Sequence, residues 1–299
     1  MSRSSESTKT GHLSDEERLF IEKAHGFLEN PSLLIRIANK IGKPIERTLE
    51  MMPDKQKKMI HQAVDTALRK GLVAVCGTVT KPSASHGMLA KPFAETAIGA
   101  RGMGLMHSAA AFGTGAAGGF FGFASLPIEL PVTTAIMLRS IAATAQEFGM
   151  DLTKSEVQLE CLYILSLGSP GTEGDDAVDS AYWGSRVAFS KLMQEAAQFL
   201  ASRTFAQVAK EIEKNTAPIL VRFIAQVASR FEVVVSEKVL AELVPAIGAI
   251  GGGLINAAFT DYFSEAARYH FGLRALEEKH GVKAIRAVYD TFKSETVAG

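Results

Sequence analysis

The sequence predicts an all-α protein, and three observations lead to this fold class. Apolar residues recur with helical spacing through most of the chain. Runs in which apolar and polar residues alternate, as in a half-buried strand, are nearly absent. Prolines and glycines divide the periodic segments into lengths typical of helices. We therefore expect a single helical domain over residues 13–299, preceded by a tail.

The helices are expected between recognisable start and stop signals. Residues 1–12 are polar and contain no apolar stretch of the kind found in signal peptides, so they predict a disordered tail. Ser14 and Glu17 then form a capping box that begins the first helix. The expected helices cover residues 15–29, 32–41, 54–76, 92–126, 131–148, 154–167, 175–203, 205–243, 246–277 and 282–293.

Most of the expected boundaries fall at prolines, because proline removes a helical hydrogen bond. Pro31, Pro44 and Pro53 separate the early helices. The pair Pro127 and Pro131 predicts a break before the helix at 131–148. Residues 168–176, GSPGTEGDD, predict the clearest loop. Short apolar runs at 71–79 and 233–235 fit a helix or a strand, and their flanks favour a helix.

Composition excludes several classes of protein. Lys plus Arg and Asp plus Glu number 32 each, so no overall charge favours nucleic acid as a partner. Two cysteines, Cys76 and Cys161, lie far apart in apolar surroundings. They predict neither a disulfide framework nor a Cys-based zinc site, and they fit a cytoplasmic location.

A glycine-rich stretch raises the question of a dinucleotide site. Residues 113–118 match G-x-G-x-x-G, which binds phosphate when a buried strand precedes it and a helix follows it. Here the preceding residues 107–112 are an alanine-rich helix former, and Pro127 follows soon after the last glycine. A Rossmann site is therefore disfavoured, and we expect no cofactor.

The same stretch predicts a helix with one face of small residues. Seven small side chains follow one another at spacings of four and three, which are consecutive a and d positions of a helical seam. These residues are Gly104, Ser108, Ala111, Gly115, Gly118, Gly122 and Ser125. A glycine in the middle of a helix lowers the stability of the helix by about 1 kcal/mol relative to alanine. Several glycines on one face therefore predict that this face packs closely against another backbone.

Two segments without charged residues, 102–128 and 243–260, are expected to pack together through such small residues. In the second segment, Ala249, Gly253, Asn256 and Thr260 form the corresponding stripe. Three interpretations are open: a close-packed core, a helical hairpin that enters a bilayer, or the wall of an apolar ligand cavity. Asn256 is expected as a buried polar residue that specifies packing, with a ligand contact as the alternative.

Three segments resemble the EcsC family. They are residues 126–152 with their Pro-containing break and Arg-bearing helix, the loop 167–170, and residues 237–277 with Pro-x-x-Gly-Ala and Gly-x-x-x-Asn elements. The resemblance covers about residues 50 to 290. It implies a bacterial, membrane-related accessory protein on the cytoplasmic side, with ABC transporter subunits as expected partners. It implies no particular reaction.

Few residues combine into recognisable chemistry. Arg139 is the only charge between Glu129 and Glu147, so we expect it in a structural ion pair or as a handle for a phosphate or carboxylate group. Asp176 belongs to an acidic cluster that fits a helix N-cap better than a metal site. The histidines form no zinc-binding pattern, so no metal is expected.

The leading hypothesis is a non-enzymatic protein at the inner face of the cell membrane, peripheral or partly inserted, that binds membrane lipid or a lipid-like ligand. Lys55, Lys57 and Lys58, with Arg69 and Lys70, give the helix at 54–76 a basic edge. This edge is expected as a solvated face, with contact to anionic headgroups as the alternative. The alternatives are a soluble hydrolase with Glu129, Arg139 or Asp176 near a cleft, and a soluble scaffold that self-associates. The oligomeric state stays open.

Overall fold

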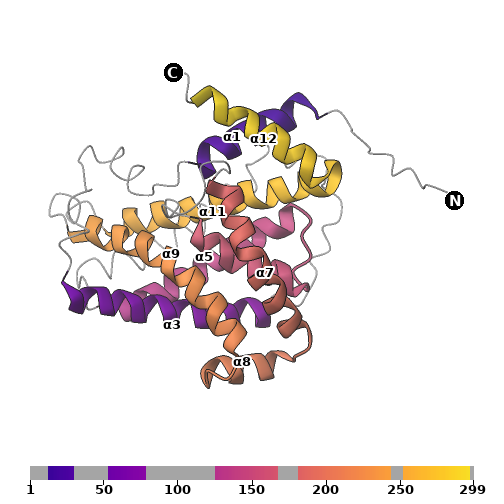
Figure 1. The fold of residues 1–299 in the computed structure, drawn as a ribbon. Coiled ribbons are helices and arrows are strands. Elements are labelled where there is room, and N and C mark those ends of the chain that lie inside the picture. Colours follow the sequence, from indigo (N-terminus) through magenta and orange to yellow (C-terminus); the bar gives the residue numbers. More distant parts are fainter. Residues whose placement is uncertain (1–12, 30–52, 79–124, 168–180, 244–251, 297–299) are drawn as a thin grey trace.

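A computed structural model describes residues 13–29, 53–78, 125–167, 181–243 and 252–296 (Figure 1). These residues form nine α-helices and one short 3-10 helix, with no strand among them, which confirms the all-α prediction. The expected tail 1–12, the helices at 32–41 and 92–124, and the loop at 168–176 lie outside the described residues.

The helix bounds agree with the prediction at most positions. The elements are α1 (Asp15–Leu28), α3 (Asp54–Thr78), α5 (Leu126–Glu147), α6 (Ser155–Tyr163), η2 (Ile164–Ser166), α7 (Ala181–Ala201), α8 (Phe205–Glu213), α9 (Pro218–Leu243), α11 (Gly252–His280) and α12 (Val282–Thr296).

The capping box at the start of α1 is confirmed. The Glu17 amide donates to Ser14 Oγ at 3.2 Å, and the Ser14 amide donates to Glu17 Oε2 at 2.9 Å. Both bonds satisfy amides that the first turn leaves without a helical partner. Glu17 Oε1 also accepts from Lys279 Nζ at 2.7 Å, so the same side chain joins α1 to the end of α11.

The predicted break at Pro127 and Pro131 is wrong. Helix α5 begins at Leu126 and continues through Pro131. Pro127 lies in the first turn of α5, where a backbone N–H would have no helical partner. Pro131 lies one turn later, so the helix lacks one backbone hydrogen bond close to its N-terminal end. Because the helix is continuous, positions 129 and 139 face different directions.

The predicted single helix over 205–243 is also wrong, because two helices occupy this range. Helix α8 ends at Glu213, and Asn215 adopts a left-handed backbone with φ of 55°. Asparagine tolerates this conformation better than most residues. Pro218 then begins α9, a position at which proline stabilises rather than breaks a helix.

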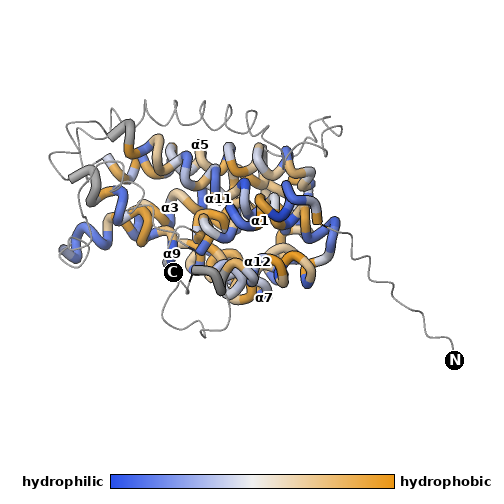
Figure 2. The backbone as a smooth tube through the Cα atoms, turned by 90° about the horizontal axis from the view of Figure 1, so that it is seen from above, coloured by the Kyte–Doolittle hydropathy of each residue, from blue (hydrophilic) through white to orange (hydrophobic). Residues whose placement is uncertain are grey.

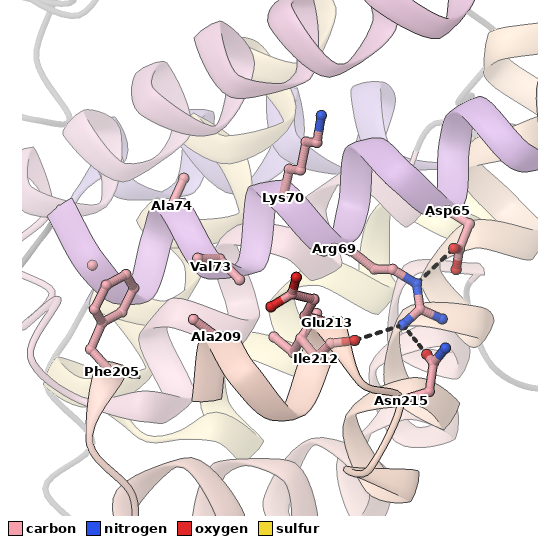
Figure 3. Close-up of a pocket in the computed structure, with 11 residues that line it drawn as sticks. Asp65, Arg69, Lys70, Val73, Ala74, Phe205, Ala209, Ile212, Glu213 and Asn215 are labelled. Atoms are coloured by element: carbon pink, nitrogen blue, oxygen red, sulfur yellow. Dashed lines mark hydrogen bonds and ion pairs between the residues drawn. The ribbon is translucent and has the colours of Figure 1, made fainter. Parts of the chain in front are cut away.

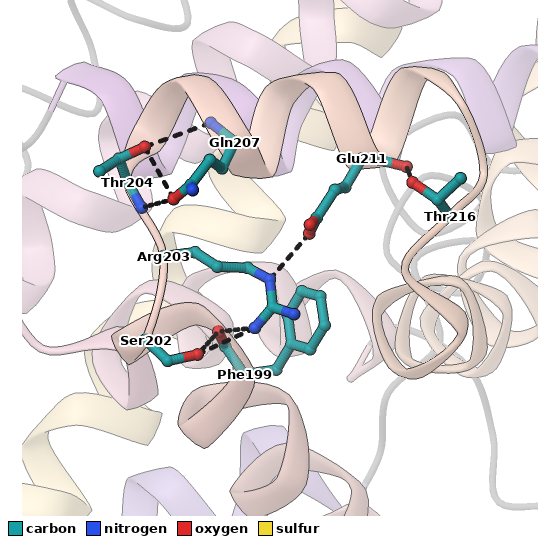
Figure 4. Close-up of polar contacts among 7 residues, drawn as sticks. All are labelled: Phe199, Ser202, Arg203, Thr204, Gln207, Glu211 and Thr216. Carbon is teal, nitrogen blue, oxygen red and sulfur yellow. Dashed lines mark hydrogen bonds and ion pairs between the residues drawn. The ribbon is translucent and has the colours of Figure 1, made fainter.

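Helix α8 is fixed to the end of α7 by a cluster around Arg203 (Figure 4). The Arg203 guanidinium lies 3.4 Å from the centroid of the Phe199 ring, and Arg203 Nε donates to Glu211 Oε2 at 2.9 Å. Thr204 caps α8 in a second capping box, with Gln207 as its partner. These contacts set the direction in which α8 leaves α7.

The helices surround a shared apolar core. Helix α3 packs against α5, α6 and α9, and α5 also packs against α11. At one end of the molecule α1 and α12 lie against each other and against α11 (Figure 1). Helix α11 carries five fully buried large residues of this core, Phe259, Phe263, Phe271, Leu273 and Leu276. At Gly272 a Cβ would lie 2.2 Å from the Phe20 ring, so α1 and α11 approach closely there.

Candidate functional site

Two of the predicted site residues, Glu129 and Asn256, meet inside the helical bundle. Asn256 Nδ2 donates to Glu129 Oε1 at 3.0 Å, across 127 positions of sequence. Glu129 begins the inner face of α5, and Asn256 lies in the first turns of α11. Asn256 is fully buried and Glu129 is 7% exposed. The packing role expected for Asn256 therefore includes a charged partner.

A third residue, Lys238 of α9, completes this cluster. Its ammonium donates to the same Glu129 Oε1 at 2.7 Å, and the lysine is fully buried. Ser125 Oγ also donates to the other carboxylate oxygen, Oε2, at 3.4 Å. A buried ion pair needs such additional hydrogen bonds, because each charge loses its hydration. We call Glu129, Lys238 and Asn256 the buried triad.

Sequence reasoning missed Lys238, although a signal for it existed. The residues one and two helical turns before it, Phe231, Val234 and Val235, are fully buried. Their spacing of three, four and seven places Lys238 on the core face of α9. A lysine on such a face requires an acidic partner, and Glu129 is the nearest counterpart that the packing of α5 supplies.

Hydroxyl groups are also buried on the inner faces of α5 and α11. Ser140 Oγ and Ser264 Oγ lie 2.8 Å apart and bridge the two helices. The hydroxyls of Thr133, Thr134 and Thr260 are buried and have no hydrogen-bond partner among the described residues. Such hydroxyls are unusual, because most buried hydroxyl groups in folded proteins are paired.

Arg139 does not have the environment predicted for it. It lies on the solvent side of α5 and is exposed, and it forms no ion pair with the described residues. Ile128, Val132 and Ala135 share this face, at the helical spacing of four, three and four residues that leads to Arg139. Ile128 is 76% exposed and Val132 is 44% exposed. We call these four residues the outer stripe of α5.

The remaining predicted site residues are not brought into this cluster. Asp176 and the seam residues lie outside the described part of the chain. The seam residues in question are Gly104, Ser108, Ala111, Gly115, Gly118 and Gly122. Gly253 lies in the first turn of α11. The predicted packing of segment 102–128 against 243–260 likewise falls largely outside the described residues.

A second buried polar network joins α6, α7 and α11. Arg186 binds both carboxylate oxygens of Glu277, and Arg274 Nε lies 3.1 Å from Glu160 Oε1. Burial raises the pKa of Glu160, and Arg274 and Arg186 counteract this only in part. The two arginines and two carboxylates balance one another, which fits a structural network that fixes three helices.

His270 lies beside this network. Its Nδ1 is 3.1 Å from the Tyr182 hydroxyl. Burial holds the pKa of His270 well below its usual value, and the Arg186 and Arg274 charges lower it further. The imidazole is therefore neutral at physiological pH and does not add a charge to the cluster. Among the described residues, no three His, Cys, Asp or Glu side chains gather closely enough to hold a metal.

The buried triad and the network can hold helices together. Glu129, Lys238 and Asn256 are sealed from solvent, so a substrate would have no route to the Lys238 amine. The outer stripe of α5, by contrast, presents apolar side chains and a guanidinium to the surroundings. It is the candidate functional surface that best fits the predicted contact with lipid.

Comparisons with known proteins agree with the resemblance seen in the sequence. The sequence model of the EcsC protein family matches residues 22–276, which is most of the chain. No curated protein and no solved structure gave a significant match. The match includes α5, α9 and the N-terminal part of α11, which supply all three residues of the buried triad. The chain therefore belongs to the EcsC family.

Proposed function

We propose that this protein acts at a membrane surface, as a non-enzymatic accessory protein that binds membrane lipid or a lipid-like ligand at the cytoplasmic face. The observation that carries the proposal is the outer stripe of α5, in which Ile128 and Val132 are exposed on an apolar helix. Figure 2 shows α5 along one side of the molecule, with apolar residues over much of its length.

Helix α5 has a composition suited to contact with lipid. Among the described residues it is the one helix that is long and apolar enough to cross a membrane. Its inner face, however, carries Glu129 and the buried hydroxyls of Thr133 and Ser140. Of its apolar 18-residue stretch, 56% is buried within the bundle. Crossing the bilayer would require breaking these contacts. We therefore assign shallow insertion of the outer face alone.

Arg139 is positioned to bind a lipid headgroup at the end of the outer stripe. It ends the outer stripe, and the described part of the chain offers its guanidinium no carboxylate within 4.0 Å. A planar guanidinium suits a headgroup phosphate, and a basic side chain near an anionic surface contributes about 1 kcal/mol. The role of phosphate handle expected from the sequence is thus retained, on the surface instead of in a pocket.

Two further features support the proposal. Lys55, Lys57 and Lys58 are exposed at the start of α3, so this part of the predicted basic edge is available for anionic lipid, whereas Arg69 pairs with Asp65. The family resemblance adds ABC transporter subunits as proposed partners. A membrane-bound accessory protein would meet such subunits at the same surface.

Binding to vesicles tests the proposal. Full-length protein should co-sediment with vesicles of phosphatidylethanolamine and phosphatidylglycerol. The double substitution Ile128→Gln and Val132→Gln should reduce the bound fraction several-fold, because it removes the apolar contact. Arg139→Gln should weaken binding to anionic vesicles more than binding to phosphatidylcholine vesicles.

Two exposed valines elsewhere provide the matched control. Val187 on α7 is 60% exposed and Val282 on α12 is 51% exposed, so their double replacement by glutamine removes a similar apolar area. That control should bind vesicles as the unmodified protein does. Equal losses in both double variants, or no binding of the unmodified protein to any vesicle, would contradict the proposal.

The two alternative functions have less support. A hydrolase site needs Glu129 and Arg139 at one cleft, whereas Glu129 is buried and Arg139 is exposed on another face of α5. Asp176 lies outside the described residues. The self-associating scaffold depends on the small-residue seam at 104–122, which lies outside them as well.

A further inference from the structure

A cavity of about 760 Å³ lies between α3 and α8, remote in sequence from α5 and the buried triad (Figure 3). This volume is typical of sites that hold small molecules. Its walls are mostly apolar, with a few polar residues at one end. The apolar residues that line it are Val73, Ala74, Gly77, Phe205, Ala209 and Ile212.

One end of the cavity is closed by Phe205, the first residue of α8. A Cβ on Gly77 would lie 2.5 Å from the Phe205 ring, so the ring rests directly against the backbone of α3. Phe205 is nevertheless 48% exposed, which is unusual for a phenylalanine held in one place. The Arg203 cluster and the Thr204 cap hold this end of α8, so the cavity is formed before any ligand binds.

The positive charge of Arg69, at the polar end of the cavity, is already neutralised by Asp65. Arg69 Nε donates to Asp65 Oδ2 at 2.6 Å. Its Nη1 donates to Asn215 Oδ1 at 2.5 Å and to the Ile212 carbonyl at 3.4 Å. These contacts tie α3 to the turn after α8. An arginine held in this way offers little attraction to an anionic ligand.

The charge of Glu213, unlike that of Arg69, is not neutralised by the described residues. Its carboxylate forms no ion pair within 4.0 Å in the described part of the chain. Figure 3 shows it in the space between α8 and α3. Lys70 also lines the cavity, but its side chain extends from α3 away from α8. Between α8 and α3, the Glu213 carboxylate is therefore available to a cationic group beside the apolar walls.

We propose that the cavity between α3 and α8 binds an amphipathic small molecule with an apolar body and a cationic head. The apolar part lies against Val73, Phe205 and Ala209, and the head faces the Glu213 carboxylate. This site is separate from the outer stripe of α5, so the proposal stands or falls independently of membrane binding.

Three probes that share one alkyl chain test the head preference. Decyltrimethylammonium, decanoate and decyl maltoside should be titrated into the full-length protein by calorimetry, each below its micelle concentration. No vesicles are present, so failure here is distinguishable from failure of the membrane proposal. The cation should bind about fivefold more tightly than decanoate, as expected for one solvent-accessible carboxylate, with the neutral probe between them.

Two pairs of variants locate the site. Ala209→Leu fills the cavity and should reduce binding of all three probes at least tenfold. Ala206→Leu is its control on the same helix, because Ala206 is exposed and does not line the cavity. Glu213→Gln should remove the preference for the cation, whereas Glu195→Gln on the exposed face of α7 makes the same change in net charge and should keep it.

Three results would overturn the proposal. The first is the absence of saturable binding by every probe. The second is equal binding to the Ala209→Leu and Ala206→Leu variants. The third is decanoate binding as tightly as the cation. Circular dichroism and a thermal melt of each variant establish that it is folded.

Discussion

Lys238 Nζ and Glu129 Oε1 lie 2.7 Å apart, in a pair that spans 109 positions of sequence and excludes solvent. The pair joins α9 to α5, and Asn256 extends it to α11. Three helices are thus connected at one carboxylate. Since an uncompensated charge inside a protein is expensive, the pair makes their mutual arrangement specific.

Lys238→Met should lower the free energy of unfolding by about 3 to 5 kcal/mol, because it leaves the Glu129 carboxylate buried without its counter-ion. The double variant with Glu129→Met should be more stable than Lys238→Met alone, since neither charge of the pair then remains. Urea denaturation measures both. Lys214→Met, at an exposed lysine after α8, should change stability by less than about 0.5 kcal/mol. A similar loss in the two lysine variants would disprove the role of the pair.

Gly272→Ala should destabilise the protein by about 1 to 3 kcal/mol, because the new methyl group overlaps the buried Phe20 ring at 2.2 Å and approaches Phe148 at 3.2 Å. Gly26→Ala is the matched control within a helix. Apart from the backbone of its own helix, no atom of the described residues lies within 4 Å of its added Cβ. Alanine also has the higher helix propensity, so this variant should be equally or more stable. Thermal unfolding of both variants tests whether α1 and α11 are as close as described.

Stability should depend on pH through Glu17. Burial alone would raise the pKa of this carboxyl, but the Lys279 ammonium, the Ser14 amide and His280 hold it at about 2, against 4.5 when unfolded. A depressed folded pKa means that the stabilisation is complete above pH 4.5 and is lost as the pH falls toward 2. After allowance for solvent screening by the exposed Lys279, we expect about 1 to 2 kcal/mol.

Glu17→Gln should remove this part of the acid sensitivity. Denaturant midpoints measured between pH 2.5 and pH 6 should converge for the variant and the unmodified protein at the acid end, and diverge at the upper end. Parallel curves over the whole range would exclude the proposed linkage.

The two cysteines should resist thiol reagents in the folded protein. Burial raises the pKa of the Cys76 thiol to about 12 and raises that of Cys161 further, so neither forms thiolate near neutral pH. Labelling with an aromatic disulfide reagent should be slow in buffer and should reach both thiols in denaturant. Rapid labelling of either cysteine in buffer would show that α3 or α6 opens more readily than this packing implies.

The sequence by itself determined the fold class, most helix bounds and the first capping box, because these depend on local periodicity and on residues within one helical turn. The two wrong boundaries, at Pro131 and at Asn215, arose where local signals compete. A proline near a helix start can be accommodated, and an asparagine can supply a left-handed turn that no periodicity reveals.

The tertiary structure decided which candidates meet. The sequence singled out Glu129, Asn256 and Arg139 as physically unusual, but the structural ion pair that it predicted for Arg139 does not form with the described residues. The packing of α5 turned Glu129 inward to Lys238 and turned Arg139 outward at the end of an apolar stripe. Long-range contacts of this kind depend on how helices far apart in sequence pack, and no spacing along one chain segment contains that information.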